Sequence, residues 1–264
     1  MMKCMSPRTL WIRVLLITGL HAFLTLSFSP FVLAVPFAAG ERLVYNITWL
    51  GINVGTGVLE VKPKESYQNK EAFRIISTAR SNDLISFFFP VEDEIESWVD
   101  ANGIFSYFIQ ISQHHGLRRV SKEVLFDQEQ HQATMVYKGK TRTFPIPPRV
   151  QDSLSSLYFF RTLEDLPIGR SVFIDVHESK KNWRLEIQIL GHERITVPIG
   201  TFDTIKTKAT VQYEGVLMDK GDVYIWFTND ERKIPVLMKG RITIGTITAT
   251  LASGDLPTRI APHP

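Results

Sequence analysis

From Glu41 onward, apolar and polar residues alternate with a period close to two over most of the chain. This period is typical of β-strands with one buried and one solvated face, because successive side chains of a strand point to opposite faces. In residues 203–213, for example, Ile205, Ala209 and Val211 alternate with a wholly polar set that includes Lys206 and Lys208. Apolar runs and alternation predict further strands at 42–49, 56–62, 72–80, 104–112, 117–126, 133–138, 172–176, 183–189, 222–228 and 242–251.

One helix interrupts this pattern, at residues 153–163. Asp152 can cap its free amides, and an apolar stripe follows on one face: Leu154, Leu157, Tyr158 and Phe160. The proline-rich stretch 145–152 before it predicts an extended crossing and a candidate subdomain seam, since proline is excluded from central ladder positions. The sequence therefore predicts an all-β fold, a large curved antiparallel sheet or barrel-like structure with one short helix. Curved sheets of this size commonly leave an apolar hollow.

Turn residues separate the predicted strands. Asn102-Gly103, Lys138-Gly139 and the sequence 219–221 supply residues that tolerate positive φ or bond their own backbone. Val197-Pro198-Ile199-Gly200 fits a type I turn, with proline at the second position and glycine at the fourth. We expect the chain to reverse at each of these places.

The first 34 residues have the character of an export signal. Lys3, Arg8 and Arg13 precede an uncharged run over 14–34, and the small residues near Ala34 suit cleavage after it. We expect residues 35–264 to form a single β-rich domain that is periplasmic or secreted. The alternative is an inner-membrane anchor through residues 14–34, although Pro30 and His21 disfavour a spanning helix.

The charge balance excludes one class of partner. Without the three basic residues of the leader, the 30 Lys and Arg of the chain fall to 27, equal to its 27 Asp and Glu. No long-range positive field remains to recruit nucleic acid. The single cysteine, Cys4, lies before the apolar run, so the mature chain has no disulfide and depends on its core for stability.

The sequence carries no motif that specifies a reaction. It has no GxSxG elbow and no phosphate-binding loop, and we expect no cofactor and no metal site. The adjacent pair His114-His115 points to opposite faces of a strand, and the acidic run 92–96 is typical of a solvated strand edge. His177 shares a strand face with Ser171 and Asp175, which predicts an exposed polar face rather than a catalytic base.

The segment 84–90, with sequence LISFFFP, is the most apolar part of the chain after the leader. Two interpretations compete. The favoured one is a buried short helix or strand that fills one end of the barrel, because most apolar clusters are core. The other is a flap that meets lipid or a protein partner.

Four stretches of this chain resemble one exported bacterial family, known as domain of unknown function 3108. They are GERLVYNITWLGINVGTGVLEV, DSLSSLYFFR, VPIGTFDTIKTKA and VYIWFTNDERKIPVLMKGRITIGTITATL, which together span roughly residues 37–251. The resemblance implies a β-rich secreted or periplasmic domain and brings no catalytic residues. The matching residues have an architectural interpretation, in turns, loops and packing: Pro198, Gly200, Phe202, Trp226, Asp230 and Pro235.

Three hypotheses for function follow. The leading one is a non-enzymatic exported β-domain that binds a lipid, acyl chain or other hydrophobic small molecule in a groove between the sheet and helix 153–163. Its candidate ligand-binding residues are Phe87, Phe88, Phe89, Leu157, Tyr158 and Trp226. The second is a structural or assembly factor that binds an envelope protein through segment 84–90 or a free sheet edge. The third is an uncharacterised hydrolase that uses His177 or the acidic run.

Overall fold

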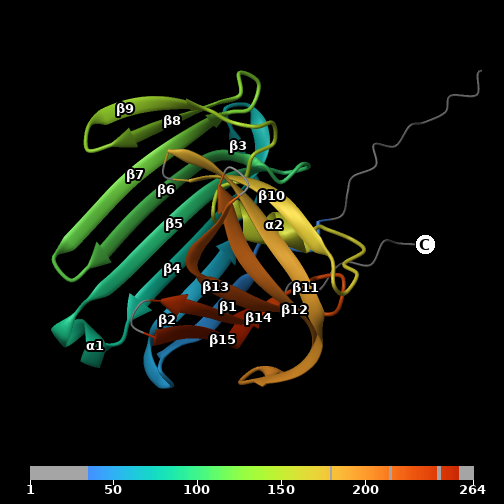
Figure 1. Cartoon of the computed structure of the whole chain (residues 1–264). Coiled ribbons are helices and arrows are strands. Elements are labelled where there is room, and N and C mark those ends of the chain that lie inside the picture. The colour runs from blue at the N-terminus through green and yellow to red at the C-terminus, as the bar shows by residue number, and fades with distance from the viewer. Residues whose placement is uncertain (1–34, 179, 214–215, 243–244, 256–264) are drawn as a thin grey trace, which may run out of the picture. The chain divides into compact units, whose positions relative to one another are not determined.

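The computed structural model describes residues 35–178, 180–213, 216–242 and 245–255, which form one antiparallel sheet of 15 strands with two short helices (Figure 1). The helices are α1 (Asp83–Phe88) and α2 (Ser155–Arg161). The strands are β1 (Arg42–Trp49), β2 (Ile52–Val61), β3 (Glu65–Tyr67), β4 (Lys70–Ser81), β5 (Val91–Asp100), β6 (Ser106–His115), β7 (Arg118–Asp127), β8 (Gln132–Tyr137), β9 (Lys140–Pro145), β10 (Ser171–Glu178), β11 (Lys181–Val197), β12 (Gly200–Tyr213), β13 (Val216–Thr228), β14 (Pro235–Ile242) and β15 (Gly245–Asp255).

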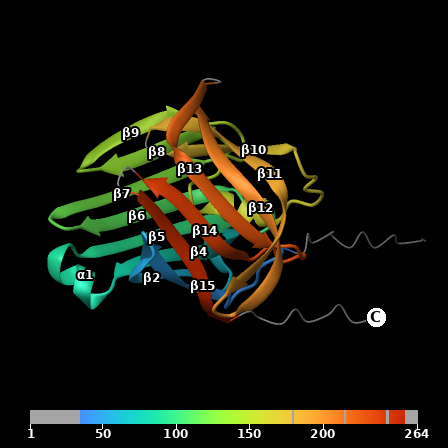
Figure 2. The same ribbon diagram turned by 60° about the horizontal axis from the view of Figure 1, so that its bottom comes forward.

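The sheet has two sequential halves joined by its first and last strands. Strand order is β10-β11-β12-β13-β14-β15-β1-β2-β4-β5-β6-β7-β8-β9, with β3 paired to β4. Strand β1 therefore pairs with β15 on one side and with β2 on the other. Strands β9 and β10 are the two ends of this order and do not pair with each other, so the curved sheet is not closed by a ladder (Figures 1 and 2).

The predicted all-β antiparallel class is confirmed, and the alternation that predicted it matches the burial of side chains. Ile187 and Ile189 of β11 are buried, while Gln188 between them is exposed. Strands β3, β5, β9 and β14 were not predicted from the alternation. In β5, with sequence VEDEIESWVD, the alternation of apolar and polar residues is interrupted, because the buried residue Ser97 is polar.

The strand connections depend on turn residues. Pro198 and Ile199 form the two-residue turn between β11 and β12, and Val197 pairs with Gly200 across it. Lys138 and Gly139 both have positive φ, as a type I′ hairpin turn requires. The predicted turn at 219–221 is wrong, since these residues lie inside β13; the ladder of β12 with β13 shifts register there instead.

The predicted helix 153–163 is present as the shorter α2. Asp152 is buried, and its Oδ1 accepts the backbone N–H groups of Leu154 at 2.7 Å and Ser155 at 2.8 Å. Its Oδ2 accepts hydrogen bonds from the hydroxyls of Ser97 and Ser106, which tie the start of α2 to β5 and β6. The carboxylate therefore links a helix start to the sheet.

The other end of α2 is held by a buried ion pair. Both guanidinium ends of Arg161 donate to the carboxylate of Glu41, at 2.6 and 2.8 Å, and Nε donates to the carbonyl of Arg232 at 3.1 Å. The guanidinium also lies over the rings of Phe37 and Tyr158. The start of α2 is thus held by β5 and β6, and its end by the segment before β1 and by the β13–β14 loop.

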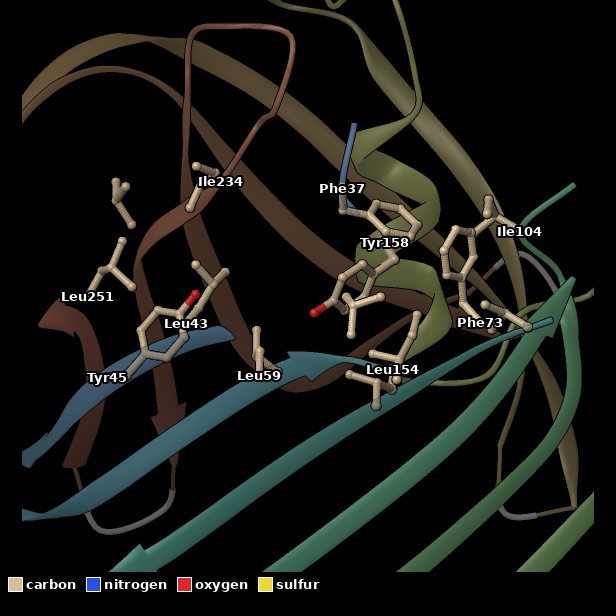
Figure 3. Close-up of a cluster of buried hydrophobic side chains, with 14 of the residues drawn as sticks. Phe37, Leu43, Tyr45, Leu59, Phe73, Ile104, Leu154, Tyr158, Ile234 and Leu251 are labelled. Carbon is tan, nitrogen blue, oxygen red and sulfur yellow. The ribbon is translucent and has the colours of Figure 1, made fainter. Parts of the chain in front are cut away.

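Three apolar clusters make the core. The largest surrounds Tyr158, whose ring meets Phe37 edge to face at 4.9 Å, and includes residues of both halves of the sheet (Figure 3). A second cluster lies under β6–β8 and a third between α2 and β10–β13. Partly buried Leu157 and Phe159 of α2 pack against both the first and the third cluster, so α2 connects these two parts of the core.

The segment 84–90 is helical at α1 but exposed, so the favoured expectation of a buried segment is wrong. Phe87 is 83% and Phe88 75% exposed. The physical reason is position: α1 connects β4 to β5 beyond the end of the sheet, where no second layer covers it.

Candidate functional site

The candidate site is a hollow between α2 and the inner face of the second half of the sheet. It consists of two adjoining cavities of about 200 and 190 Å³, and Ser153, Ser156 and Leu185 line both of them. The first is also lined by Leu157, Phe160, Ile187, Thr207, Ala209, Ile225, Phe227 and Met238. The second is also lined by Val176, Glu178, Trp183 and Val211.

The periodicities of helix and strand bring these side chains together. Residues 156, 157 and 160 share the face of α2 that is turned toward the sheet, because they are one turn of the helix apart, and Ser153 lies in the turn just before α2 on the same side. Leu185 and Ile187 of β11, and Thr207 and Ala209 of β12, alternate along their strands and so share the inner face.

Small side chains leave the space open. Ser153, in the turn before α2, and Ser156 on α2 line the hollow together with Thr207 and Ala209 of the sheet, whereas other lining positions hold the larger Leu and Phe. The lining of the first cavity contains no charged residue, and the second has one, Glu178, whose carboxylate lies 3.6 Å from Lys122 Nζ. The hollow is thus suited to an apolar ligand and offers little to a charged one.

Of the six candidate ligand-binding residues, Leu157 lines this hollow. Tyr158 belongs to the opposite side of α2 and is buried in the largest core cluster. Phe87 and Phe88 of α1, with Phe89 after it, lie elsewhere on the surface.

Trp226 is also a packing residue in this structure. It is 4% exposed and belongs to the largest core cluster, whereas its neighbours Ile225 and Phe227 line the hollow. Its Nε1 donates to Glu193 Oε2 at 2.7 Å, and the ammonium groups of Lys206 and Lys239 lie 5.0 and 5.3 Å from its ring. Trp226 therefore packs in the core, with charged side chains beside its ring, and does not line the hollow.

The turn and loop residues lie away from the hollow's lining. Phe202 packs partly buried against the largest core cluster. Asp230 accepts hydrogen bonds from the Thr228 hydroxyl and from the backbone N–H of Arg232, which orders the β13–β14 loop. The carbonyl of Pro235 accepts the hydroxyl of buried Tyr45 at 2.8 Å.

The lining residues that sequence reasoning did not select are mainly apolar strand residues. Ile187, Ala209 and Ile225 each fall on the apolar side of a predicted alternation, so the sequence placed them on the inner face. Nothing in the alternation distinguishes an inner residue that borders a hollow from one that fills the core.

The expected exposed position of His177 is wrong. The residue is 2% exposed, and its ring lies against Phe126 and Phe144, from β7 and β9. Its Nδ1 lies 2.7 Å from Asn182 Oδ1. Asn182 Nδ2 donates to the carbonyl of Pro145, so the amide oxygen of Asn182 is the group that faces the imidazole. Burial lowers the pKa of His177. The neutral imidazole thus joins the two ends of the sheet, where β9 and β10 do not pair.

The acidic run lies on β5, and three of its four carboxylates contact basic side chains of neighbouring strands. Glu92 pairs with Arg80 at 3.1 Å, Asp93 with His115 at 2.7 Å, and Glu96 with Arg74 at 2.6 Å. Glu92 and Asp93 border a larger surface depression of about 770 Å³ over β4–β8, lined mostly by polar and charged side chains of both signs. Among the residues that the structure describes, no cluster of three or more His, Cys, Asp or Glu is placed to hold a metal ion.

Fold and hollow together define the class: a β-rich, barrel-like domain with a buried helix and an apolar hollow beside it. The family model for Protein of unknown function (DUF3108) matches residues 44–252, and the chain belongs to this family. No curated protein matches the chain. In the part of the chain that the structure describes, no helix is long and apolar enough to cross a membrane.

A solved structure of a β-barrel-like protein shows the same kind of fold. A β-barrel-like protein of domain of unknown function DUF1849 from Brucella abortus has a TM-score of 0.55 at 9% identity, over 84% of this chain and 99% of that chain. A protein with a YmcC-like fold from Bacteroides fragilis has a TM-score of 0.34 at 9% identity, over 83% and 97%. The hypothetical protein CT021 from Chlamydia trachomatis has a TM-score of 0.31 at 11% identity, over 86% and 94%.

Proposed function

We propose that this chain is a non-enzymatic binding domain of the cell envelope, and that the hollow beside α2 holds an apolar ligand such as a lipid or acyl chain. The apolar lining of the hollow carries the proposal. The assignment of the protein to the cell envelope is supported by the leader of residues 1–34, whose basic start and apolar run are typical of exported proteins.

The size of the hollow favours a thin ligand. Each cavity alone is smaller than the roughly 300–1,000 Å³ of ordinary small-molecule sites, so a ligand that extends through both is required. Each buried methylene contributes about 0.8 kcal/mol, so ten of them give a gross gain of about 8 kcal/mol before the costs of association. A single acyl chain is thin enough to extend through both cavities and has enough methylenes to bind without a charged anchor.

The test uses residues 35–264 purified without detergent. We expect native mass spectrometry to detect a co-purified lipid, and a fluorescent fatty acid to bind the delipidated protein. Ala209→Leu fills the hollow and should weaken this binding roughly tenfold or more, since it removes room for at least two methylenes. Thr210→Leu, the next residue of β12 with its side chain on the other face, is the matched control and should bind as the parent does.

Equal binding by the Ala209→Leu and Thr210→Leu variants would place the ligand outside the hollow. A delipidated protein that binds no fatty acid would refute the proposal as a whole.

The open sheet edge supports a second candidate, an assembly factor that binds an envelope protein. The five residues 140–143 and 145 of β9 are exposed, and the outer side of this strand has no partner strand. An exposed strand edge can pair with an added strand. A photo-crosslinking residue at Thr141 should then capture one discrete protein in intact cells, whereas the same residue at exposed Lys181 of β11 should not.

A further inference from the structure

One end of the first half of the sheet carries an exposed apolar surface, which we call the apolar end. Three connections form it: the β1–β2 turn with Leu50 and Ile52, α1 with Leu84 and the three phenylalanines 87–89, and the β6–β7 turn with Leu117. These seven are more than half of the 13 large hydrophobic side chains that are exposed in the described part of the chain. Figures 1 and 2 both place α1 and the ends of β2, β6 and β7 at this end.

Hydrogen bonds hold the three connections together. Asn82 Nδ2 donates to the carbonyl of Asn53 at 2.9 Å, which joins α1 to the start of β2. The N–H of Gly116 donates to the carbonyl of Pro90 at 2.8 Å, and the ring of Phe89 lies so close that a Cβ at Gly116 would be 2.6 Å from it. The apolar end is therefore one connected surface rather than three independent loops.

The opposite end of the same strands has a different character. Its connections, at residues 62–64, 101–105 and 128–131, contain none of the exposed large hydrophobic side chains, and Ile104 there is buried. Exposed apolar residues are thus a property of one end and not of turns in general. Scattered exposed hydrophobic residues are normal, but a contiguous group marks an interaction site.

The backbone of α1 suits entry into an apolar medium. Asn82 Oδ1 accepts the N–H of Ile85, the carbonyl of Asn82 accepts the N–H of Ser86, and the carbonyl of Ile85 accepts the N–H of Phe89. No charged residue occurs between Leu84 and Phe89. Because unsatisfied backbone groups make insertion into lipid costly, this short helix lowers that cost.

Basic side chains lie beside the apolar residues. Arg118 and Arg119 directly follow Leu117, are exposed, and have no ion pair within the described part of the chain. Lys138 and Lys140 follow at the β8–β9 turn on the same side. Of the nearby acids, Glu92 pairs with Arg80 and Asp93 contacts His115, which leaves exposed Glu94, at the depression that Arg119 also borders, and Asp83 of α1 against these four basic side chains.

We propose that the apolar end docks on a bilayer that contains anionic phospholipid. Phe87, Phe88 and Leu117 enter the boundary between headgroups and acyl chains, and Arg118 and Arg119 bind headgroup phosphates. Charge complementarity favours an anionic surface. The projecting shape favours lipid over a protein: Leu117 is fully exposed, and a fluid medium adapts to single projecting side chains, whereas a protein partner needs a matching pocket for each.

The test measures flotation of residues 35–264 with vesicles of phosphatidylcholine, with and without phosphatidylglycerol. These residues contain all three core clusters, and the described part of the chain belongs to one compact unit. We expect binding to the vesicles with phosphatidylglycerol. Phe87→Ser with Phe88→Ser should weaken it by roughly a hundredfold, and Arg118→Glu with Arg119→Glu by roughly tenfold or more and only on anionic vesicles.

Two controls separate docking from general stickiness and from misfolding. Ile168→Ser with Leu190→Ser removes two exposed apolar side chains outside the apolar end and should leave binding unchanged. The natural cysteine, Cys4, lies outside residues 35–264, so Phe88→Cys can carry a unique environment-sensitive dye. Its emission should shift to the blue on anionic vesicles, and the same dye at Gln130→Cys, at the opposite end, should not respond.

The proposal is overturned if the parent does not float, if the phenylalanine variant floats equally well, or if the arginine variant keeps its preference for anionic vesicles. A discrete protein crosslinked at Phe88 in place of lipid would also overturn it. Fatty-acid binding in the hollow should be the same in the parent and in the phenylalanine variant, so this test stands apart from the proposed function.

Discussion

At the residue scale, the least expected features are polar groups that the fold buries. Arg161 and Glu41 are 1% and 3% exposed and lie 120 residues apart in sequence. Two charges in such a place are stable only when each is fully paired and hydrogen bonded. Their contacts span the N-terminal segment, α2 and the β13–β14 loop, which makes the pair a tie between three parts of the chain.

Arg161→Lys should lower the free energy of unfolding by about 3 kcal/mol, because an ammonium group cannot reproduce the two-pronged contact and the bond to Arg232. Chemical denaturation measures this. The control is Arg194→Lys at the exposed pair with Asp203, where we expect a change below about 1 kcal/mol. Equal effects in the two variants would contradict the role given to the buried pair.

His177 should make stability depend on pH. Its pKa is lowered in the folded protein by burial, so the unfolded chain, whose histidines titrate near pH 6.5, takes up the proton more readily. The contribution of neutral His177 is then complete above about pH 6.5 and is lost as pH falls from there toward the lower folded pKa. Urea unfolding measures this. When the pH is lowered from 8 to 5.5, the free energy of unfolding should fall more for the parent than for His177→Gln.

The exposed His131 provides the control for this experiment. His131→Gln should lose as much stability as the parent between the two pH values. The same pH dependence in the parent and in His177→Gln would exclude the buried imidazole as its source.

At the element scale, hairpins and one capped helix account for the fold. Alternation predicted most strands because a half-buried antiparallel strand repeats its environment every two residues. It did not predict β9, which lies at an edge with five of its six residues exposed, since such a strand has no apolar face to display. The exposure of α1 was also not predictable from composition, because a short apolar sequence is equally compatible with a buried core segment and with an exposed apolar surface.

Close packing of neighbouring strands can be tested at a glycine of β2. A Cβ at Gly55 would lie 2.1 Å from the backbone carbonyl oxygen of Arg80 in β4, so Gly55→Ala must push the two strands apart. We expect a loss of about 2 kcal/mol or more in the free energy of unfolding. Gly240→Ala in β14, where a Cβ meets nothing within 4 Å, should cost less than about 0.5 kcal/mol, and a similar cost at both sites would contradict the assigned β2–β4 contact.

At the scale of the whole molecule, the pairing of β1 with β15 decides how the chain holds together. This ladder joins the first strand to the last, and the largest core cluster contains residues of both halves. A sheet joined in this way has its best protected strands at the junction and its least protected strands at β9 and β10.

We therefore expect hydrogen exchange in residues 35–264 to be slowest in β1, β2 and β15 and fastest in β9 and β10. Unfolding should be one transition, followed equally by tryptophan fluorescence and far-ultraviolet circular dichroism. Two separate transitions would instead support the predicted subdomain seam at residues 145–152.

The sequence by itself determined the class of fold, the position of the buried helix and the inner face of most strands. These depend on local periodicity and on capping and turn residues, which act over a few positions of the chain. The tertiary structure alone decided that small side chains of α2 and β12 face each other across a hollow, that His177 is buried between β7 and β9, and that three distant connections meet at one end. Each of these depends on which strands become neighbours, and that is set by packing between residues far apart in the sequence.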